Sequence, residues 1–289
     1  MNHTTLQIFQ TVAEEQSVTK AAKRLGRVQS NITTRIRQLE EELGVTLFVR
    51  DSKKMTLSAE GASFLSYAQK ILSLAEEARQ ALHPAKPAGT LNVGAMEATA
   101  ASRLMPILQQ FHRHYPDVAL TLKTMPTGQL LAGVRNATLD CALVSLPPNA
   151  SGEPTCPTDI ECVNVFTERL VLLTPHQMTA GGEAKIRFAA FPKGCSYRAR
   201  GEALLNSLSE GDKTVEVQEV GSYHSMIACV ASGGYRCLLP ESVAATLTLP
   251  QESQLQFVDD ALTQLVWRKG YASPALGEMQ KILAMASNL

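Results

Sequence analysis

Residues 17–43 read SVTKAAKRLGRVQSNITTRIRQLEEEL, and this segment most limits what the chain can fold into. It carries six Lys or Arg between Lys20 and Arg37, with no acidic residue in that interval. Two stretches with helical spacing of apolar residues are separated by Gly26, which suits the left-handed backbone of a tight turn. The pattern predicts a helix that enters a DNA groove and a second helix that braces it.

The same spacing assigns a buried and an exposed side to each helix. A first helix is predicted from Leu6, Phe9, Val12 and Ala13, which repeat at helical spacing. Ser17 or Thr19 can cap the second helix. The third helix has a buried stripe made of Ile32, Ile36, Leu39 and Leu43. Ser30, Thr34 and Arg37 therefore point the other way, and this side is predicted to face DNA.

The residue types on this side fit DNA recognition. Short polar side chains can read base edges, whereas Lys and Arg contact phosphates and set the register. The following VTLFVRDSKKMTLS predicts a β-hairpin wing with basic tips. The predicted DNA-binding residues are Thr19, Lys23, Arg27, Gln29, Ser30, Asn31, Thr33, Thr34, Arg35, Arg37, Arg50, Lys53 and Lys54. The alternative is a solvated basic helix pair without a nucleic-acid partner.

Global charge does not decide between these readings, because 27 Lys and Arg balance 27 Asp and Glu. The polar N-terminus predicts no signal peptide, and no apolar run is long enough to span a membrane. A cytoplasmic location and six free thiols are therefore expected. Cys156 and Cys162 have no nearby His, so no metal site is predicted, and no cofactor motif is present.

A long helix is predicted from Ser58 to about Leu82, where there is no Pro and the only Gly lies in the first turn. Its apolar seam consists of Leu65, Ala68, Ile71, Leu72, Ala75, Ala78 and Leu82. A helix of this length exceeds what a sixty-residue domain can cover, which favours pairing with a second chain. The alternative is packing against the rest of its own chain. HPAKPAG at 83–89 then marks a domain boundary.

From Thr90 onward, expected strands alternate with expected helices, a pattern typical of parallel α/β sheets. Strands are expected at Leu91–Ala95, Ala119–Thr124, Cys141–Ser145 and Glu168–Leu173, with helices near 98–115 and 127–137. A second set is expected at Val215–Val220, Ser222–Ala231, Tyr235–Leu239, Glu241–Thr246 and Leu255–Val258. The chain then returns through Leu262–Trp267 and ends in a helix from Pro274 to about Ala286. Two sets with a return segment predict two lobes around a cleft.

Ligands of open α/β sheets bind beyond the C-terminal ends of strands, where helices begin. Four segments fall there, Gly94–Thr99, Thr127–Gln129, Cys195–Arg198 and Ser222–His224, together with Ser145. The predicted effector-binding residues are Glu97, Ala98, Thr99, Thr127, Gly128, Ser145, Cys195, Ser196, Tyr197, Arg198, Ser222, Tyr223 and His224. Arg198 could pair with a ligand carboxylate and Glu97 with an ammonium. Each also has a structural reading: Glu97 favours the helix dipole, Ser222 is a good helix cap, and Arg198 suits a solvated surface.

The N-terminal sixty residues resemble the LysR-type transcriptional regulators. The matching residues are Phe9, Val12, Ala13, Ser17, Ala21-Ala22, Leu25, Gln29, Ile36, Leu39-Glu40, Glu42-Leu43-Gly44, Leu47-Phe48, Arg50, Leu57, Ser58 and Gly61. The chain has Val28, Ser30 and Thr34 where the family usually has Ser, Pro and Arg, so the usual cap of the recognition helix is missing. The match is weaker in the C-terminal part. There, GCSYR, SYHSMIACV, LLP and LVWRKG resemble the subgroup of glutamate-synthase, citrate-synthase and polyamine-utilisation regulators.

This resemblance implies a winged helix-turn-helix domain at 1–58, a linker and dimerisation helix with hinge at 59–89, and an effector domain at 90–289. The effector domain would have the fold of type 2 periplasmic binding proteins, with lobe I at about 90–165 and 266–289 and lobe II at about 166–265. The expected partners are promoter DNA, a small effector, further copies forming a dimer or tetramer, and RNA polymerase if the protein activates. The effector could be amino-acid-like, polyamine-derived or a carboxylate.

Other functions were weighed against this reading. An enzyme would need Cys195 as nucleophile with His176 or His224 as base, but nothing places a His beside Cys195, and no G-x-S-x-G motif is present. No catalytic residue is therefore predicted. A redox-sensing regulator switched through Cys195 remains the alternative, with Cys229 or Cys237 as the resolving thiol.

Overall fold

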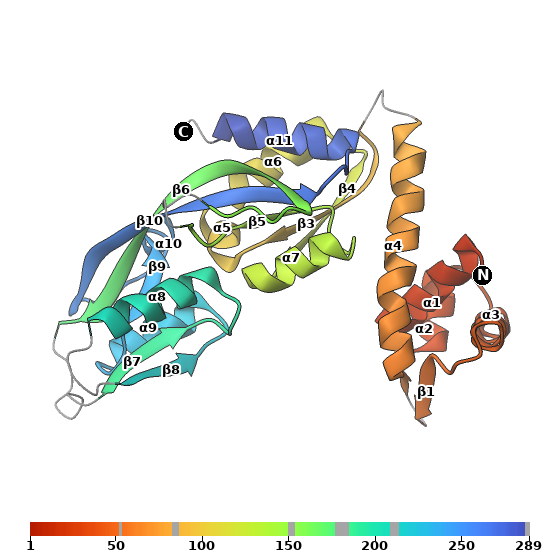
Figure 1. The fold of residues 1–289 in the computed structure, drawn as a ribbon, viewed down its shortest axis with the longest axis horizontal. Helices are drawn as coiled ribbons and strands as arrows, with labels where there is room; N and C mark the ends of the chain where they lie inside the picture. The colour runs from red at the N-terminus through yellow and green to blue at the C-terminus, as the bar shows by residue number, and fades with distance from the viewer. Residues whose placement is uncertain (52–53, 83–86, 150–153, 177–184, 209–213, 287–289) are drawn as a thin grey trace. The chain divides into compact units, whose positions relative to one another are not determined.

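The computed structural model describes residues 1–51, 54–82, 87–149, 154–176, 185–208 and 214–286 (Figure 1). The chain divides into two compact units, one built by roughly the first eighty residues and the other by nearly all the rest. Each unit is described by itself below.

The N-terminal unit begins with three helices, α1 (His3–Glu15), α2 (Val18–Arg24) and α3 (Gln29–Leu43). The side chains of Asn2 and Ser17 cap the first two, and Ser17 is thus the cap of α2. No side chain caps α3, whose N-cap residue is Val28. This absence agrees with the departure seen in the sequence. Gly26 and Gly44 follow α2 and α3 with positive φ angles of 61° and 68°, so each ends its helix as expected.

A hairpin and a long helix complete this unit: β1 (Phe48–Asp51), β2 (Lys54–Leu57) and α4 (Ala59–Ala81). The hairpin confirms the predicted wing. The ring of Phe9 on α1 packs against Phe48 at 5.3 Å and against Phe64 at 5.2 Å between centroids, so one aromatic side chain joins the wing and α4 to α1. A Cβ at Gly61 would lie 2.0 Å from the carbonyl oxygen of Leu47, which explains a glycine in the first turn of α4.

The C-terminal unit starts with alternating strands and helices: β3 (Gly89–Ala95), α5 (Glu97–Ser102), α6 (Leu104–His114), β4 (Val118–Thr124), α7 (Thr127–Arg135) and β5 (Cys141–Val144). The chain continues through β6 (Ile160–Pro175), β7 (Lys185–Ala190), α8 (Ser196–Ser207), β8 (Thr214–Glu219) and α9 (Tyr223–Ala231). It ends with β9 (Cys237–Pro240), α10 (Glu241–Ala244), β10 (Ser253–Arg268) and α11 (Pro274–Ala286). The predicted bounds of α11 are confirmed, whereas the segment 98–115 holds two helices separated at Arg103.

The main sheet has the order β4-β3-β5-β10-β6-β9 and is mixed. Strands β4, β3 and β5 are parallel, but β10 runs antiparallel to β5 and β6, and β6 antiparallel to β9. The prediction of purely parallel sheets was therefore wrong, since the two long strands connect in opposite directions. Leu255–Val258 and Leu262–Trp267 are parts of one strand, β10, whose pairing with β6 is irregular between Phe257 and Asp259.

The two long strands β6 and β10 run through both lobes of this unit (Figure 1). One lobe carries α5, α6, α7 and α11, and the other carries α8, α9 and the parallel pair β7-β8. Cores of buried aliphatic and aromatic side chains fill both lobes, and one cluster continues from Leu130 and Val134 to Tyr197 and Tyr223. This two-lobed arrangement sets the carboxyl ends of β3 and β4 opposite the N-termini of α8 and α9.

Candidate DNA-binding surface and effector cleft

The burial of α3 separates its two faces. Ile32, Ile36 and Leu39 are almost fully buried, while Leu43 is half-buried at the end of the stripe. The opposite face carries exposed Gln29, Ser30, Thr33, Thr34, Arg35 and Arg37. The predicted orientation of the helix is thus confirmed, and a continuous polar face remains for a partner. The individual base and phosphate contacts stay predictions.

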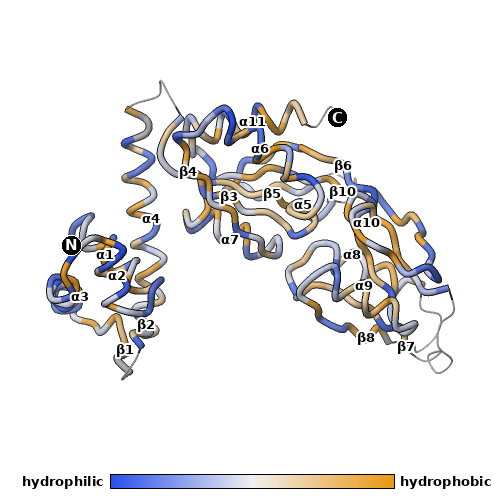
Figure 2. The backbone as a smooth tube through the Cα atoms, turned by 180° about the vertical axis from the view of Figure 1, so that it is seen from behind, coloured by the Kyte–Doolittle hydropathy of each residue, from blue (hydrophilic) through white to orange (hydrophobic). Residues whose placement is uncertain are grey.

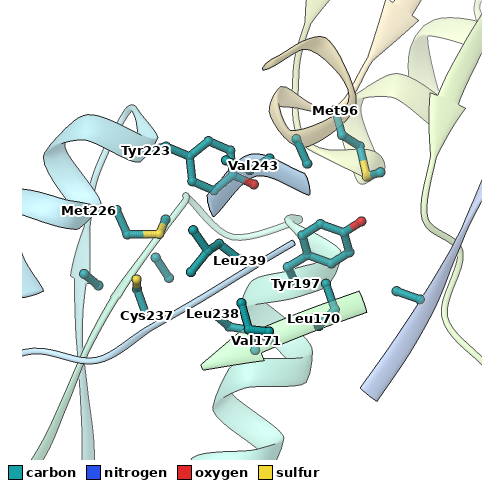
Figure 3. Packing of buried hydrophobic residues seen from close by; sticks show 14 of the residues in the cluster. Met96, Leu170, Val171, Tyr197, Tyr223, Met226, Cys237, Leu238, Leu239 and Val243 are labelled. Atoms are coloured by element: carbon teal, nitrogen blue, oxygen red, sulfur yellow. The ribbon is translucent and has the colours of Figure 1, made fainter. Parts of the chain in front are cut away.

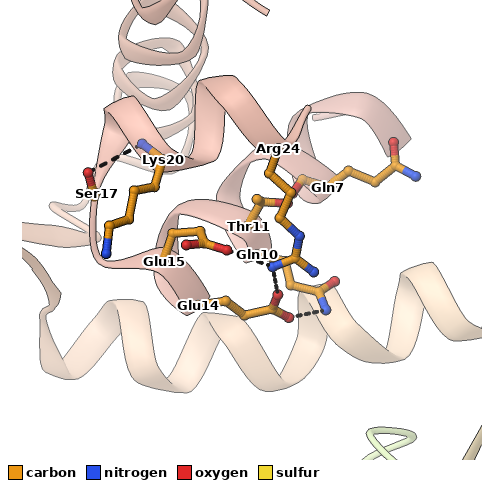
Figure 4. A network of polar contacts seen from close by, with 8 residues as sticks. All are labelled: Gln7, Gln10, Thr11, Glu14, Glu15, Ser17, Lys20 and Arg24. Carbon is orange, nitrogen blue, oxygen red and sulfur yellow. Dashed lines mark hydrogen bonds and ion pairs between the residues drawn. The ribbon is translucent and has the colours of Figure 1, made fainter. Parts of the chain in front are cut away.

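The cations around α3 differ in how far they are already paired. Arg37 donates from Nε to Glu41 at 2.7 Å. Arg24 bridges Glu14 at 2.8 Å and Glu15 at 3.1 Å, and these pairs join α2 to α1 (Figure 4). Lys23, Arg27 and Arg35 are exposed and form no ion pair with the described residues. Exposed ion pairs contribute little to stability, so Arg37 can exchange Glu41 for a phosphate at low cost.

The other predicted DNA contacts lie at the edges of this surface. Thr19 on α2 and Lys54 on β2 are exposed. Asn31 is half-buried, and its Oδ1 has no hydrogen-bond partner among the described residues. The backbone of Arg50 lies in β1, but its side chain falls outside the described part, and Lys53 lies outside the described residues altogether.

The apolar side chains of α4 divide into two groups. Ala68, Leu65 and Leu72 pack against the core of their own unit, which corrects the idea of one seam facing a partner. Tyr67, Ile71 and Leu74 stay exposed, at 60%, 41% and 62%. Figure 2 shows hydrophobic and hydrophilic residues alternating along this helix. An apolar strip therefore remains on α4 after its own domain has been covered.

A cleft of about 260 Å³ opens between the lobes of the C-terminal unit. One lobe contributes the ends of β3 and β4 with the starts of α5 and α7, and the other contributes the loops before α8 and α9. The lining residues are Met96, Glu97, Ala98, Thr124, Met125, Pro126, Thr127, Gln129, Phe191, Pro192, Cys195, Tyr197, Gly221 and Tyr223. Figure 3 shows Tyr197 and Tyr223 on one side and Met96 on the other.

The structure brings together some of the predicted effector-binding residues and separates others. Those in the lining are Glu97, Ala98, Thr127, Cys195, Tyr197 and Tyr223. Those outside it are Thr99, Gly128, Ser145, Ser196, Arg198, Ser222 and His224. Ser222 caps α9 by accepting from the Ser225 amide at 3.2 Å, which is its structural reading. Ser145 is fully buried, and its amide lies 3.2 Å from the Met96 sulfur.

Arg198 is placed differently from the prediction. It is only 7% exposed, and its guanidinium donates to Glu202 at 2.8 Å, Glu219 at 2.5 Å and the Phe191 carbonyl at 3.2 Å. The expected pairing with a ligand carboxylate is therefore wrong for this structure, because all three contacts are internal. Arg198 instead holds the backbone of Phe191, which does line the cleft.

Sequence reasoning missed several lining residues. Phe191 and Pro192 follow β7, a strand that was not predicted, and Met125 and Pro126 fill the short loop between β4 and α7. The loop could have been found, because it directly precedes the predicted helix start at Thr127. The run of Ile186 to Ala190 ending before Phe191-Pro192 was the available signal for the other.

Burial dominates the electrostatics of the cleft. It raises the pKa of Tyr197 and of Tyr223, and the nearby Glu97 raises the pKa of Tyr223 further. Both phenols are therefore neutral at physiological pH. Burial also raises the pKa of the Cys195 thiol, although the backbone amides of Arg198 and Tyr197 partly offset it. No group of three or more His, Cys, Asp or Glu suited to a metal occurs in the described ranges.

Comparison with known proteins agrees with both regions. Residues 3–62 match the family described as bacterial regulatory helix-turn-helix protein, lysR family, and residues 84–286 match the LysR substrate binding domain. The transcriptional regulator YusT of Bacillus subtilis is 37% identical over 262 residues, covering 90% of this chain and 86% of YusT. GltR of the same organism is 37% identical over 251 residues, covering 85% of this chain and 82% of GltR.

Solved structures share the fold along the whole chain. A full-length OxyR variant from Pseudomonas aeruginosa has a TM-score of 0.71 at 24% identity, with 100% of this chain and 95% of that one covered. CbnR, described as a LysR family transcriptional regulator, has a TM-score of 0.66 at 23% identity, with 99% of each chain covered. No helix among the described residues is long and apolar enough to cross a membrane. With both domains matched and relatives aligned over most of their length, the chain belongs to the LysR family of DNA-binding transcriptional regulators.

Proposed function

We propose that the protein binds promoter DNA in a sequence-specific way through α3 and the wing, and that a small metabolite in the cleft modulates this binding. The exposed polar face of α3 supports the proposal most directly, because three neighbouring cations remain unpaired with the described residues. Cations without protein partners are available to neutralise phosphates, and hydroxyl and amide side chains can read base edges.

Pairing of two chains through the exposed strip of α4 would bring two recognition helices to two half-sites. Tyr67, Ile71 and Leu74 supply that strip. We propose a dimer as the basic unit, with a tetramer formed from two dimers, and RNA polymerase as a further partner if the protein activates transcription. The effector would change the relative placement of the lobes and thereby the bend imposed on the DNA.

Fluorescence anisotropy with DNA from the protein's own promoter region tests the DNA contacts. Arg35→Ala should weaken binding and lower the slope of log K against log salt by about 0.9, the value for one phosphate contact. Arg113→Ala on α6, also an exposed cation, is the matched control and should change neither quantity. An unchanged salt slope in Arg35→Ala would remove this residue from the DNA surface.

The alternative of a redox switch at Cys195 has less support from the contacts. Burial raises the pKa of this thiol, which lowers the thiolate fraction that reacts with oxidants. The thiol neighbours in the described residues are Cys156 with Cys162 and Cys229 with Cys237. Neither pair includes Cys195, so the geometry favours ligand control over thiol oxidation.

A further inference from the structure

The lining of the cleft contains a single charged side chain, the carboxylate of Glu97. No Lys, Arg or His of the described chain belongs to the lining. Arg198, the nearest candidate for an anion-binding cation, has its guanidinium taken up by Glu202, Glu219 and the Phe191 carbonyl. Lys123 and Lys193 are neighbours of the lining in sequence, but both are exposed and lie outside it. The fixed charge of the cleft is therefore negative.

Helix N-termini could still attract an anion, but their amides at the cleft are already used. The Gly128 amide at the start of α7 donates to the Gly194 carbonyl at 3.3 Å. The Ser225 amide in α9 donates to the Ser222 hydroxyl, and the amides of Tyr197 and Arg198 in α8 face the Cys195 sulfur. A carboxylate would thus meet Glu97 without a cation or a free amide to offset the repulsion.

Aromatic side chains form the wall opposite Glu97. Phe191 and Tyr223 pack edge to face, with ring centroids 5.0 Å apart and an interplanar angle of 85°. Glu97 lies close enough to raise the pKa of Tyr223, so the carboxylate and the ring bound the same space. A carboxylate together with aromatic faces is the combination that binds organic ammonium groups, through ion pairing and attraction to the ring quadrupole.

Two buried hydroxyls in the lining add hydrogen-bonding capacity. Thr127 Oγ1 and Tyr197 Oη are buried and have no hydrogen-bond partner among the described residues, although Tyr197 lies near the Thr263 hydroxyl. Both residues are exposed by only 6% and 4%. Buried polar atoms rarely stay unpaired, so these hydroxyls await a polar group of the ligand.

We infer that the effector is a small organic cation, whose ammonium lies between Glu97 and the Phe191–Tyr223 wall and whose polar end bonds to Thr127 and Tyr197. The inference rests on the proposed function, because it assumes that the cleft is the effector site. It narrows the ligand from carboxylates in general to amines, and an amino acid qualifies through its ammonium only if its carboxylate lies away from Glu97.

Isothermal titration of the full-length protein tests this with three probes: a polyamine such as spermidine, a methylated ammonium such as choline, and succinate as the dicarboxylate. Binding of either amine with no binding of succinate is the expected result, and the two amine arms distinguish polyamines from methylated ammonium ligands. Glu97→Gln should weaken amine binding roughly ten-fold or more. Phe191→Leu should weaken the methylated ammonium more than the polyamine.

Asp117→Asn, an exposed acid in the same unit and outside the lining, is the matched control and should leave amine affinity unchanged. Succinate binding that is retained or tightened in Glu97→Gln, or absence of binding by both amines, would overturn the inference. Promoter DNA anisotropy with the same samples keeps the outcomes separate. DNA binding without any response to amines sinks the ligand class alone, whereas loss of DNA binding in the unaltered protein sinks the proposed function.

Discussion

Arg103 and Glu168 form a two-pronged ion pair inside the C-terminal unit, with Nε to Oε1 at 2.8 Å and a terminal nitrogen to Oε2 at 3.2 Å. Arg103 lies between α5 and α6, whereas Glu168 lies on the long strand β6 and is only 3% exposed. Ser242 of α10 donates to the same carboxylate at 2.7 Å and contacts Ser102 of α5 at 3.1 Å. The pair therefore connects α5, α10 and a strand that runs through both lobes.

Removal of one partner should be costly because it leaves a buried charge uncompensated. We expect Arg103→Met to lower the free energy of unfolding by about 2–3 kcal/mol, below the usual figure for buried pairs because Arg103 is partly exposed. Urea unfolding followed by the fluorescence of the single tryptophan, Trp267 on β10, measures this unit.

The double variant Arg103→Met with Glu168→Gln is the control for that prediction. It removes both charges and should recover part of the loss, which makes the coupling in a double-mutant cycle measurable. If the single and double variants lost stability additively, the two side chains would not act as a pair.

Val28 should be a weak point at the start of the recognition helix. Its backbone has the extended angles of an N-cap residue, φ −82° and ψ 146°, but its side chain makes no capping bond and is 69% exposed. Val28→Ser should raise the stability of the N-terminal unit by about 1 kcal/mol, because a hydroxyl can accept from a free amide of the first turn. Thermal unfolding by circular dichroism would show the gain, with Val28→Ala as the variant that lacks the hydroxyl. Equal stability of the Ser and Ala variants would contradict a capping effect.

The parts of the fold that were predictable are those in which one face is buried. Ile32, Ile36 and Leu39 repeat at a helical period, so the orientation of α3 followed from the sequence, as did the bounds of α11. The continuity of β10 did not follow, because Asp259 and Asp260 interrupt its apolar pattern. These exposed acids sit where the pairing with β6 is irregular, and local polarity was taken for a loop.

The candidate cleft was predictable only where a strand end meets a helix start. Glu97 and Thr127 follow predicted strands and do line it. Arg198 follows the same rule of position, yet its side chain turns into its own lobe, because Glu202 is one helical turn ahead and Glu219 ends the neighbouring strand β8. Such pairing depends on contacts between segments that sequence spacing does not reveal.

The exposed strip on α4 predicts self-association that charge should disrupt. Leu74→Lys places a cation among Tyr67, Ile71 and the partner strip, so we expect dimers to dissociate at micromolar protein while the fold is retained. Analytical ultracentrifugation measures the mass, and circular dichroism checks that the helix content is unchanged. Ala62→Lys, an exposed position in the first turns of the same helix, is the control and should stay dimeric. An unchanged mass for Leu74→Lys would place the dimer contact elsewhere.

Cys195 should be a poorly reactive thiol at neutral pH. Burial raises its pKa, so the thiolate that attacks an alkylating reagent is depleted at pH 7.5 and grows only as the pH rises towards the raised value. We expect iodoacetamide to modify Cys195 more slowly in the folded protein than in the same protein unfolded in urea, and the difference should narrow as the pH increases. Mass spectrometry of the peptide containing Cys195 follows the rate, and Cys195→Ser identifies its signal. Modification in the folded state that is as fast as in urea at pH 7.5 would indicate an accessible thiolate and would revive the redox switch.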